Sequence, residues 1–403
     1  MFFNVLVADF NREGWLDLFA VAYTYDDKPE TLANSSVIFF GSSSGFSPKQ
    51  STVVPTYCGG NARLADVNKD GWAEIIFYDS RGYLSIYLGG PQGYSPQRMS
   101  KVPLEVCDAT TTFSVNDIPS VTCADLNEDD WIDLIVPVMG HYVRQESGLF
   151  ILSGGPDGFS RDRTQFHALM ATGISVSVAD LNRDGHLDLL VPAYSTQYTR
   201  ELPAHIFWGN GKAFEFAKPF TIRCDSSCAF MAVDITGNGY LDLLTICHRN
   251  DLGHQVDSLL FWNGPEGLRQ GKVARLPGLG PHLSSSRDFG NALTREPLEN
   301  YISPAYDAES LKPIKISWKA ETSQHTGVKI QLRGGDSLQE LESAAWNGPA
   351  GTNTFYDKSG QEITAAEKPF KWLQYKATLI STNGCRSPKL EEVRLDFLPI
   401  EQD

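Results

Sequence analysis

One acidic loop recurs five times in the first two thirds of the sequence. Each copy follows a short apolar segment, approximates the pattern Asp-x-Asn-x-Asp-Gly-x-x-Asp, and leads into a second segment rich in Leu, Ile and Val. The loops begin at Asp9, Asp66, Asp125, Asp180 and Asp234, which are separated by 57, 59, 55 and 54 residues. A period this regular predicts that the chain repeats one structural unit, and it constrains the fold more than any other feature.

Each repeated unit has the content of a small antiparallel sheet. Two apolar segments flank the loop, and a third ends in a Gly-rich turn into an expected fourth strand: VIFFGSSSGFS, LSIYLGGPQGYS, LFILSGGPDGFS, HIFWGNGKAFE and LLFWNGPEGLR. Four strands in a unit of this length are typical of a β-propeller blade, which buries its apolar faces against neighbouring blades. The repeat therefore predicts an all-β fold, with a β-propeller of five to seven blades over residues 1–278. Residues 279–300 are either a linker or a decayed blade.

The pattern changes after residue 300. Short segments with period-two alternation follow: YISPAYDAES, PIKISWKAET, GVKIQLRGG, KWLQYKATLIST and EEVRLDFLPI. They predict a jelly-roll-like β-sandwich over residues 301–403. Its aromatic side chains are either core residues or a platform for a sugar ring, and we expect Trp346 to be the most exposed of them. The set is Trp318, Trp346, Trp372 and Tyr375.

The acidic loops have the donor atoms of a calcium site. Calcium takes about six to eight oxygen ligands, whereas zinc favours Cys or His and magnesium demands stricter octahedral geometry. We number each loop from 1 to 9. Side chains at positions 1, 3, 5 and 9 and the backbone carbonyl at position 7 then supply the oxygens, and Gly at position 6 permits the sharp turn. Asp and Asn also favour turns without any metal, but five copies at fixed spacing favour calcium.

The expected ligands fall into five sets, with position 7 contributing its carbonyl. Loop 1 has Asp9, Asn11, Glu13, Trp15 and Asp17. Loop 2 has Asp66, Asn68, Asp70, Trp72 and Glu74. Loop 3 has Asp125, Asn127, Asp129, Trp131 and Asp133, with Asp130 in place of Gly at position 6. Loop 4 has Asp180, Asn182, Asp184, His186 and Asp188, and loop 5 has Asp234, Thr236, Asn238, Tyr240 and Asp242. Loop 5 has only two acids, so we predict about one Ca²⁺ per loop, with four strong sites and one weak site.

These units resemble a known repeat family. Sequences such as VADLNRDGHLDLLV, followed by a strand and a Phe-x-Gly turn, are similar to FG-GAP, or VCBS, repeats of integrin α-subunit propellers and bacterial secreted proteins. The bacterial secreted type is the more similar of the two. The resemblance extends over residues 4–275. It implies a β-propeller with one calcium loop per blade between the first two strands, and an extracellular setting in which millimolar calcium fills weak sites.

Composition excludes several other classes of protein. The 403 residues include 49 acidic and 34 basic side chains, and the net charge of −15 disfavours a nucleic-acid partner. The sequence has no apolar run long enough for a transmembrane helix. It begins directly in the first unit without the features of a signal peptide, so we expect the chain to start inside a structural unit.

Seven cysteines leave at least one unpaired. Cys224 and Cys228 are close enough in the sequence to form a disulfide, and Cys107 has Cys58 or Cys123 as alternative partners. Buried free thiols are an equally good interpretation. The cysteines therefore leave the compartment open.

No catalytic motif stands out. The sequence has no nucleophile elbow, zinc-protease motif, phosphate-binding loop or dinucleotide fingerprint. We therefore predict a non-enzymatic, monomeric binding or adhesion scaffold, secreted or at the cell surface, that recognises a protein or a glycan. The alternative is a carbohydrate-active enzyme, a polysaccharide lyase or glycosidase, on the same calcium-binding fold. A glycosidase would need a pair of catalytic carboxyl groups, which the sequence does not single out.

Overall fold

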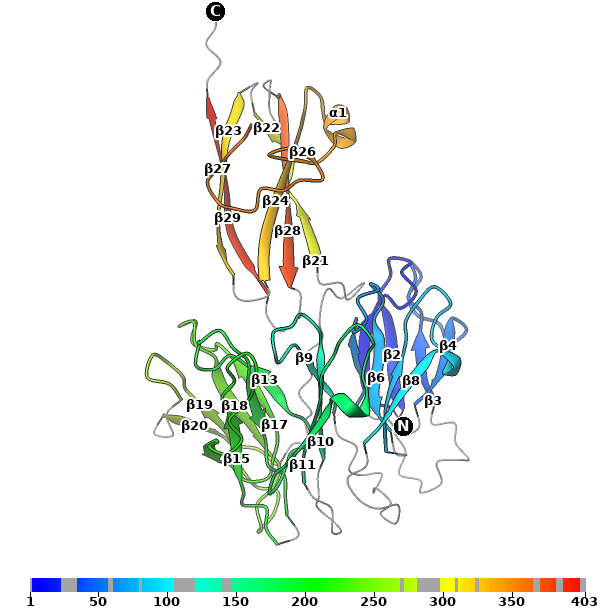
Figure 1. The fold of residues 1–403 in the computed structure, drawn as a ribbon, viewed down its shortest axis with the longest axis vertical. Coiled ribbons are helices and arrows are strands. Elements are labelled where there is room, and N and C mark those ends of the chain that lie inside the picture. The colour runs from blue at the N-terminus through cyan, green and yellow to red at the C-terminus, as the bar shows by residue number, and fades with distance from the viewer. Residues whose placement is uncertain are drawn as a thin grey trace, which may run out of the picture. The chain divides into compact units, whose positions relative to one another are not determined.

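The computed structural model divides the chain into two compact units, Met1–Glu296 and Pro297–Asp403. The described residues are 2–22, 35–56, 61–79, 82–104, 120–138, 147–196, 198–268, 272–280, 298–308, 311–322, 326–364, 370–381 and 387–398. Over these residues the chain is all-β apart from one short helix and short 3-10 turns (Figure 1). Residues 281–297, which include most of the expected linker or decayed blade, lie outside the described residues.

The first unit consists of five four-stranded antiparallel sheets, here called repeat sheets 1–5 (Figure 1). Sheet 1 contains β1 (Phe2–Ala8), β2 (Asp17–Ala22), β3 (Ser35–Phe39) and β4 (Ser51–Pro55). Sheet 2 contains β5 (Arg63–Ala65), β6 (Glu74–Tyr78), β7 (Tyr83–Tyr87) and β8 (Met99–Pro103), with the 3-10 turn η1 (Pro96–Arg98). Sheet 3 contains β9 (Thr122–Ala124), β10 (Asp133–Val138), β11 (Gly148–Leu152) and β12 (Thr164–Ala168), with the turn η3 (Arg161–Arg163). Sheet 4 contains β13 (Ser177–Ala179), β14 (Asp188–Val191), β15 (Pro203–Phe207) and β16 (Phe220–Arg223). Sheet 5 contains β17 (Ser227–Val233), β18 (Asp242–Cys247), β19 (Ser258–Phe261) and β20 (Val273–Leu276).

All five acidic loops close the first hairpin of their sheet in the same register. The residue before position 1 pairs with the residue at position 9. These pairs are Ala8–Asp17, Ala65–Glu74, Ala124–Asp133, Ala179–Asp188 and Val233–Asp242. Register in a hairpin follows from loop length, so the constant spacing within the sequence motif produces the same loop end five times.

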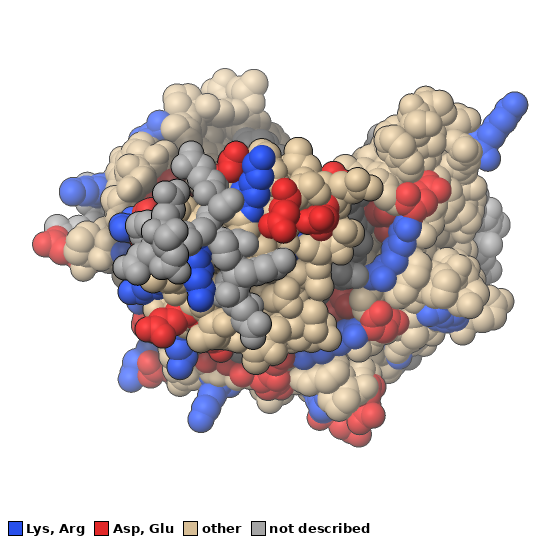
Figure 2. Space-filling view, turned by 90° about the horizontal axis from the view of Figure 1, so that it is seen from above, with Lys and Arg blue, Asp and Glu red and all other residues tan. Residues whose placement is uncertain are grey.

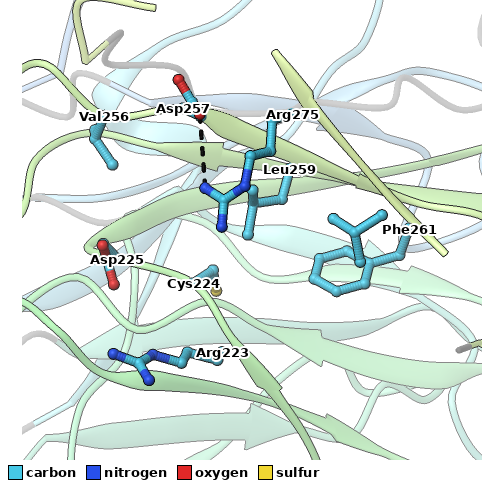
Figure 3. Close-up of a pocket in the computed structure, with 9 residues that line it drawn as sticks. Arg223, Cys224, Asp225, Val256, Asp257, Leu259, Phe261 and Arg275 are labelled. Atoms are coloured by element: carbon cyan, nitrogen blue, oxygen red, sulfur yellow. Dashed lines mark ion pairs between the residues drawn. The ribbon is translucent and has the colours of Figure 1, made fainter. Parts of the chain in front are cut away.

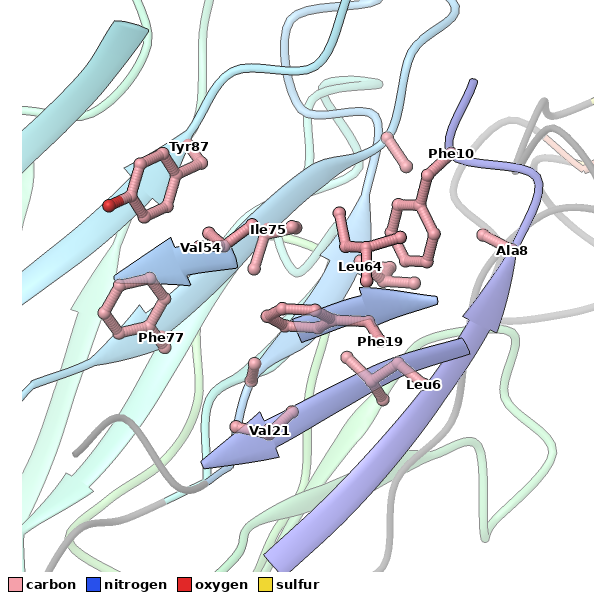
Figure 4. Close-up of a cluster of buried hydrophobic side chains, with 13 residues drawn as sticks. Leu6, Ala8, Phe10, Phe19, Val21, Val54, Leu64, Ile75, Phe77 and Tyr87 are labelled. Carbon is pink, nitrogen blue, oxygen red and sulfur yellow. The ribbon is translucent and has the colours of Figure 1, made fainter. Parts of the chain in front are cut away.

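Neighbouring repeat sheets bury their apolar faces against each other. Figure 4 shows one such cluster, in which Phe19 of β2 packs with Ile75 of β6 and Tyr87 of β7, all 0 % exposed. A second cluster joins sheets 4 and 5 and includes Ile206 and Phe230. Burying one such side chain stabilises a fold by about 1.5–3 kcal/mol, so a single sheet without its neighbour would forfeit much of its core.

The first strands of successive sheets lie next to one another. Thr122 of β9 donates a hydrogen bond from Oγ1 to the carbonyl of Val176, just before β13, at 2.6 Å. Ser177 of β13 donates in the same way to the carbonyl of Phe230 in β17, at 2.8 Å. The strands β5 and β9 are also in contact. Sheets 2 to 5 therefore follow one another in sequence order, each with its first strand against the first strand of the next.

The second unit is a two-layer sandwich. One layer contains β21 (Leu298–Ile302), β22 (Tyr306–Asp307), β24 (Thr326–Gly335), β25 (Asn347–Gly348), β26 (Gly351–Thr352) and β28 (Trp372–Ser381). The other contains β23 (Lys312–Glu321), β27 (Gln361–Glu362) and β29 (Lys389–Leu398). Ile316 of β23 and Ile330 of β24, both 0 % exposed, lie in the core that the layers share. The helix α1 (Leu338–Ser343) is N-capped by Ser337, whose side chain accepts a hydrogen bond from the Glu340 N–H. The first strand of this unit, β21, begins at Leu298.

Of the two interpretations of Cys224 and Cys228, the structure agrees with buried thiols and not with a disulfide. Cys123 and Cys247 are buried thiols as well. Cys58 and Cys107 lie outside the described residues. No helix in the described part of the chain is long and apolar enough to cross a membrane.

Candidate metal-binding loops

Backbone N–H groups hold the first carboxylate of every loop. In loop 2 the N–H groups of Asp70 and Gly71 donate to the two oxygens of Asp66, at 3.2 and 2.8 Å. The position-1 residues Asp9, Asp125 and Asp234 accept the same pair of bonds, and Asp180 accepts a bond from the Gly185 N–H. These bonds fold each loop tightly around the carboxylate at position 1, so that the side chains at positions 3 and 5 belong to the same tight turn.

Two positions in each loop have left-handed backbone conformations. At position 6 the φ values are +92°, +84°, +75°, +99° and +83° for loops 1–5, and Asp130 is the only non-glycine there. Position 4 is also left-handed. Its residues are Arg12, Lys69, Glu128, Arg183 and Gly237, with φ between +59° and +70°. Sequence reasoning predicted the first position from its glycines but missed the second, because Arg, Lys and Glu have no special preference for this region.

The position-9 carboxylate bridges two parts of its sheet. In loop 4, Asp188 accepts a hydrogen bond from the N–H of Leu181 at 2.9 Å and another from the N–H of Gly209 at 3.0 Å. In each of the other loops the position-9 carboxylate accepts the same two hydrogen bonds. One comes from the backbone N–H at position 2, and the other comes from a backbone N–H just after the third strand. All five carboxylates are 0–1 % exposed. This structural role was not anticipated from the sequence, which placed position 9 only among the ligands.

The third strand approaches the loop so closely that a side chain is excluded. A Cβ atom added at Gly209 would overlap the carbonyl oxygen of Leu187, at position 8 of loop 4. Gly41, Gly89 and Gly154 face the position-8 carbonyls of loops 1–3 in the same way. Sheet 5 differs, because Asn263 replaces the glycine and donates from Nδ2 to the position-8 carbonyl of Leu241 at 3.0 Å. In sheets 1–4 the Gly of the Phe-x-Gly turn is therefore required by packing against the loop.

Burial and mutual repulsion both act on the loop carboxylates. Burial is the main cause that raises the pKa of Glu74 to about 8, and the nearby charges of Asp66 and Asp70 raise it further. The same causes raise the pKa of Asp188 to about 7 and that of Asp133 to about 6. Asp17 also has a raised pKa, with burial as the largest cause. In loops 1–4, acids are thus packed together at a cost that a bound cation would offset.

Loop 5 has a different electrostatic balance. Backbone hydrogen bonds, first of all from the Gly239 N–H, lower the pKa of Asp234. Asn238 at position 5 donates from Nδ2 to the carbonyl of Asn263 at 3.1 Å. Loop 5 therefore stabilises its first carboxylate mainly through backbone hydrogen bonds, and a cation has less repulsion to relieve there.

The donor chemistry of the loops fits a hard cation. The expected ligands are carboxylate, amide, hydroxyl and backbone carbonyl oxygens, which calcium prefers over nitrogen or sulfur. Within the described residues, no three His, Cys, Asp or Glu side chains converge into a ready-made metal-binding group. In loop 4 the Asn182 amide donates from Nδ2 to Asp184 Oδ2 at 2.9 Å, and loops 2 and 3 have the same bond. Binding of a cation by positions 3 and 5 together would replace that bond.

The aromatic residues expected to stack on a sugar are partly covered. Arg333 lies over the ring of Trp346, with Cζ 4.4 Å from the ring centroid, and Lys376 Nζ lies 5.2 Å from the same centroid. Trp346 is half-buried, as are the other three residues of the set. Trp318 and Tyr375 pack against the core of the sandwich.

A separate pocket of 390 Å³ lies between the outer strands of sheets 4 and 5 (Figure 3). Asp225 and Asp257 line it, and Asp257 pairs with Arg275 at 3.6 Å. The pocket also contains Cys224, whose pKa is raised to about 12 by burial. That thiol stays protonated near neutral pH and is a poor nucleophile.

Comparisons with known proteins give one family match and several distant structural likenesses. Residues 172–199, which include loop 4, match the FG-GAP repeat. No curated protein sequence matches. The biofilm matrix protein Bap1 of V. cholerae is similar at 11 % identity and a TM-score of 0.40, covering 94 % of this chain and 68 % of that one. The exo-β-1,3-galactanase Pc1,3Gal43A of Phanerochaete chrysosporium, with β-1,3-galactotriose, is similar at 10 % identity and a TM-score of 0.32, covering 89 % and 100 %. These likenesses are too weak to transfer an activity.

Proposed function

We propose that the chain is a calcium-stabilised β-propeller that acts outside the cell as a non-enzymatic binding scaffold for a protein or a glycan. The repeat sheets that meet through their first strands, and the FG-GAP match over residues 172–199, support this proposal. The surface is compatible with it as well. On the face shown in Figure 2, Asp and Glu side chains are interspersed with Lys and Arg, so that face has no continuous basic area for a phosphate backbone.

The observation that carries the calcium proposal is the crowding of carboxylates in loops 1–4. Loops 1, 2 and 4 each hold three acids within nine residues and loop 3 holds five, and the buried acid at position 9 has a raised pKa in all four. A carboxylate has about four acceptor positions, so the two backbone bonds at position 9 leave room for a metal ligand. Positions 1, 3, 5 and 9 and the position-7 carbonyl would hold the ion. Loop 5 would bind it more weakly.

Calcium in such loops would act on structure rather than on chemistry. An ion bound only by the folded chain stabilises it by mass action, by about 2.7 kcal/mol for each site at a concentration 100 times its Kd. Each loop also joins the first two strands of a sheet to the end of the third through position 9. Filling the loops would therefore stiffen the ends of the sheets, where the partner-binding surface of a scaffold would lie.

Terbium luminescence provides a direct test. Trp15, Trp72 and Trp131 occupy position 7 of loops 1–3, next to the proposed ligand carbonyls, so their indoles should transfer excitation energy to bound Tb³⁺. We expect sensitised emission that excess calcium abolishes, and a melting temperature that rises with calcium and falls with chelator. Asp157→Asn, which removes an exposed acid from a turn outside the loops, should change neither result. An unchanged melting temperature in millimolar calcium, with no sensitised emission, would refute the calcium proposal.

The scaffold role needs its own experiment. The full chain should retain specific glycans or protein ligands on an array in calcium, without releasing shorter sugars from any of the polysaccharides tested. Turnover that is lost in both Asp225→Asn and Asp257→Asn would overturn the non-enzymatic proposal and would identify the pocket of Figure 3 as the catalytic centre.

A further inference from the structure

The position-4 side chain of each of the first four loops contacts the position-7 side chain of the next loop. Arg12 Cζ lies 4.5 Å from the ring centroid of Trp72, and Lys69 Nζ lies 4.4 Å from that of Trp131. Glu128 Oε1 lies 2.7 Å from Nδ1 of His186. The fourth contact places Arg183 Cζ 4.8 Å from the ring centroid of Tyr240. All four junctions between successive loops therefore have the same register.

The left-handed backbone at position 4 accounts for these contacts. Residues at positions 1, 3 and 5 turn their side chains toward the backbone of their own loop, as their hydrogen bonds show. Position 4 instead reaches the neighbouring loop. Trp15 has no preceding loop in this sequence and is 46 % exposed, whereas the other four position-7 side chains are all less exposed. At the other end of the series, Gly237 has no side chain to extend.

We propose that Arg12, Lys69, Glu128 and Arg183 are positioning residues for the cation site of the following loop. This inference rests on the proposed calcium binding. The contacted residue is the one whose backbone carbonyl would be a ligand, so fixing its side chain also restricts the orientation of that carbonyl. Position 4 lies between ligand positions 3 and 5 of its own loop. Binding in one loop and binding in the next are therefore coupled, and by thermodynamic reciprocity each changes the affinity of the other by the same factor.

The junction between loops 2 and 3 has an additional contact. Lys69 Nζ lies 3.3 Å from Oδ2 of Asp130, the residue that replaces Gly at position 6 of loop 3. Asp130, which departs from the Gly of the motif, thus provides Lys69 with a second partner in the next loop. Both side chains are about half-exposed, so the ion pair itself contributes little and serves mainly to orient Lys69 over Trp131.

A charge-matched pair of variants separates positioning from simple electrostatics. Lys69→Met and Lys69→Gly both remove one positive charge, but only the methionine retains a stem over the indole, and glycine readily adopts a φ of +60°. If Lys69 acts only through its charge, both variants change calcium affinity equally. If it positions Trp131, Lys69→Gly lowers the affinity of one site relative to Lys69→Met by about two- to tenfold, the range of a methionine–aromatic contact.

A double-mutant cycle on the full chain shows which loop is affected. Asp129→Asn weakens loop 3, and Asp70→Asn weakens loop 2. Calcium affinities from calorimetry should show Lys69→Gly to be non-additive with Asp129→Asn and closer to additive with Asp70→Asn. As a control, Lys101→Met removes a cation 5.9 Å from the ring of Tyr83, away from the loops, and should leave the affinities unchanged.

The outcomes distinguish this inference from the proposal on which it rests. If the unmodified chain binds no calcium, the proposed function fails. Suppose instead that the unmodified chain binds calcium but Lys69→Gly and Lys69→Met have the same calcium affinity, or Lys69→Gly is non-additive only with Asp70→Asn. Positioning of the next loop is then refuted, while calcium binding stands.

Discussion

Replacing Gly209 with Ala tests the close contact between the third strand and the loop. The new methyl group would overlap the Leu187 carbonyl oxygen, and the end of β15 would have to move away from loop 4. That movement would stretch the bond from the Gly209 N–H to Asp188, which is 3.0 Å long. The perturbation is therefore a steric clash together with the loss of a buried hydrogen bond to a carboxyl group.

The expected loss of stability is about 3 kcal/mol. Overpacking by one methyl group costs about 1–3 kcal/mol, and a hydrogen bond to a charged group contributes about 1.5–3 kcal/mol. Ala also lowers the conformational entropy of the unfolded chain relative to Gly, which offsets about 0.4–1 kcal/mol of the lost stability. At roughly 2 °C per kcal/mol for a unit of this size, the melting temperature should fall by about 6 °C.

The assay is thermal and denaturant unfolding of the full chain, with Gly264→Ala as the matched control. No atom lies within 4 Å of a Cβ added at Gly264, and its backbone is not left-handed, so its stability should change by less than about 0.5 kcal/mol. Gly154→Ala faces the Ile132 carbonyl in the same way as Gly209 and should be as damaging. If Gly209→Ala were no more harmful than Gly264→Ala, the packing argument for the Phe-x-Gly turn would be refuted.

Three further variants test the loops. Asn263→Ala removes two side-chain bonds to backbone carbonyls and should destabilise the chain by about 1–2 kcal/mol with or without calcium, as measured by denaturant unfolding. Asp242→Asn leaves one backbone N–H without an acceptor and should cost about 1–3 kcal/mol, to nearly the same extent in chelator and in calcium because loop 5 binds weakly; a much larger loss in calcium would contradict the ordering of the sites. Asp184→Asn preserves the acceptor for the His186 N–H, so calorimetry should show one weakened calcium site while the melting temperature in chelator stays nearly constant.

The repeated hairpins were predictable from the sequence because their information is local. A constant loop length and apolar flanks determine the register that places Asp188 opposite Ala179, and the same argument applies to each copy. The left-handed conformation at Lys69 was not predictable, since nothing in a lysine favours it. It is compensated by contacts with Trp131 and Asp130, which are about sixty residues further along the chain.

Outside the loops, too, features that depend on distant contacts could not be predicted from the local sequence. Sequence spacing placed Cys224 and Cys228 within reach of each other, but both side chains are buried as thiols in sheets 4 and 5. Trp346 has polar and small neighbours in the sequence, yet Arg333 and Lys376 cover it from other strands. In both cases the deciding contacts come from packing between segments that the sequence pattern does not connect.

The contact between Glu128 and His186 has a consequence for how such a chain can change its number of units. Loss of the second unit by recombination would bring Arg12 against Trp131, which again joins a cation to an aromatic ring. Loss of the fourth unit would instead bring Glu128 against Tyr240, and a carboxylate gains nothing from the negative face of a ring. The junction of the third and fourth units therefore differs from the others, because Glu128 is matched to His186 and would not be matched to the aromatic residues at position 7 of the other loops.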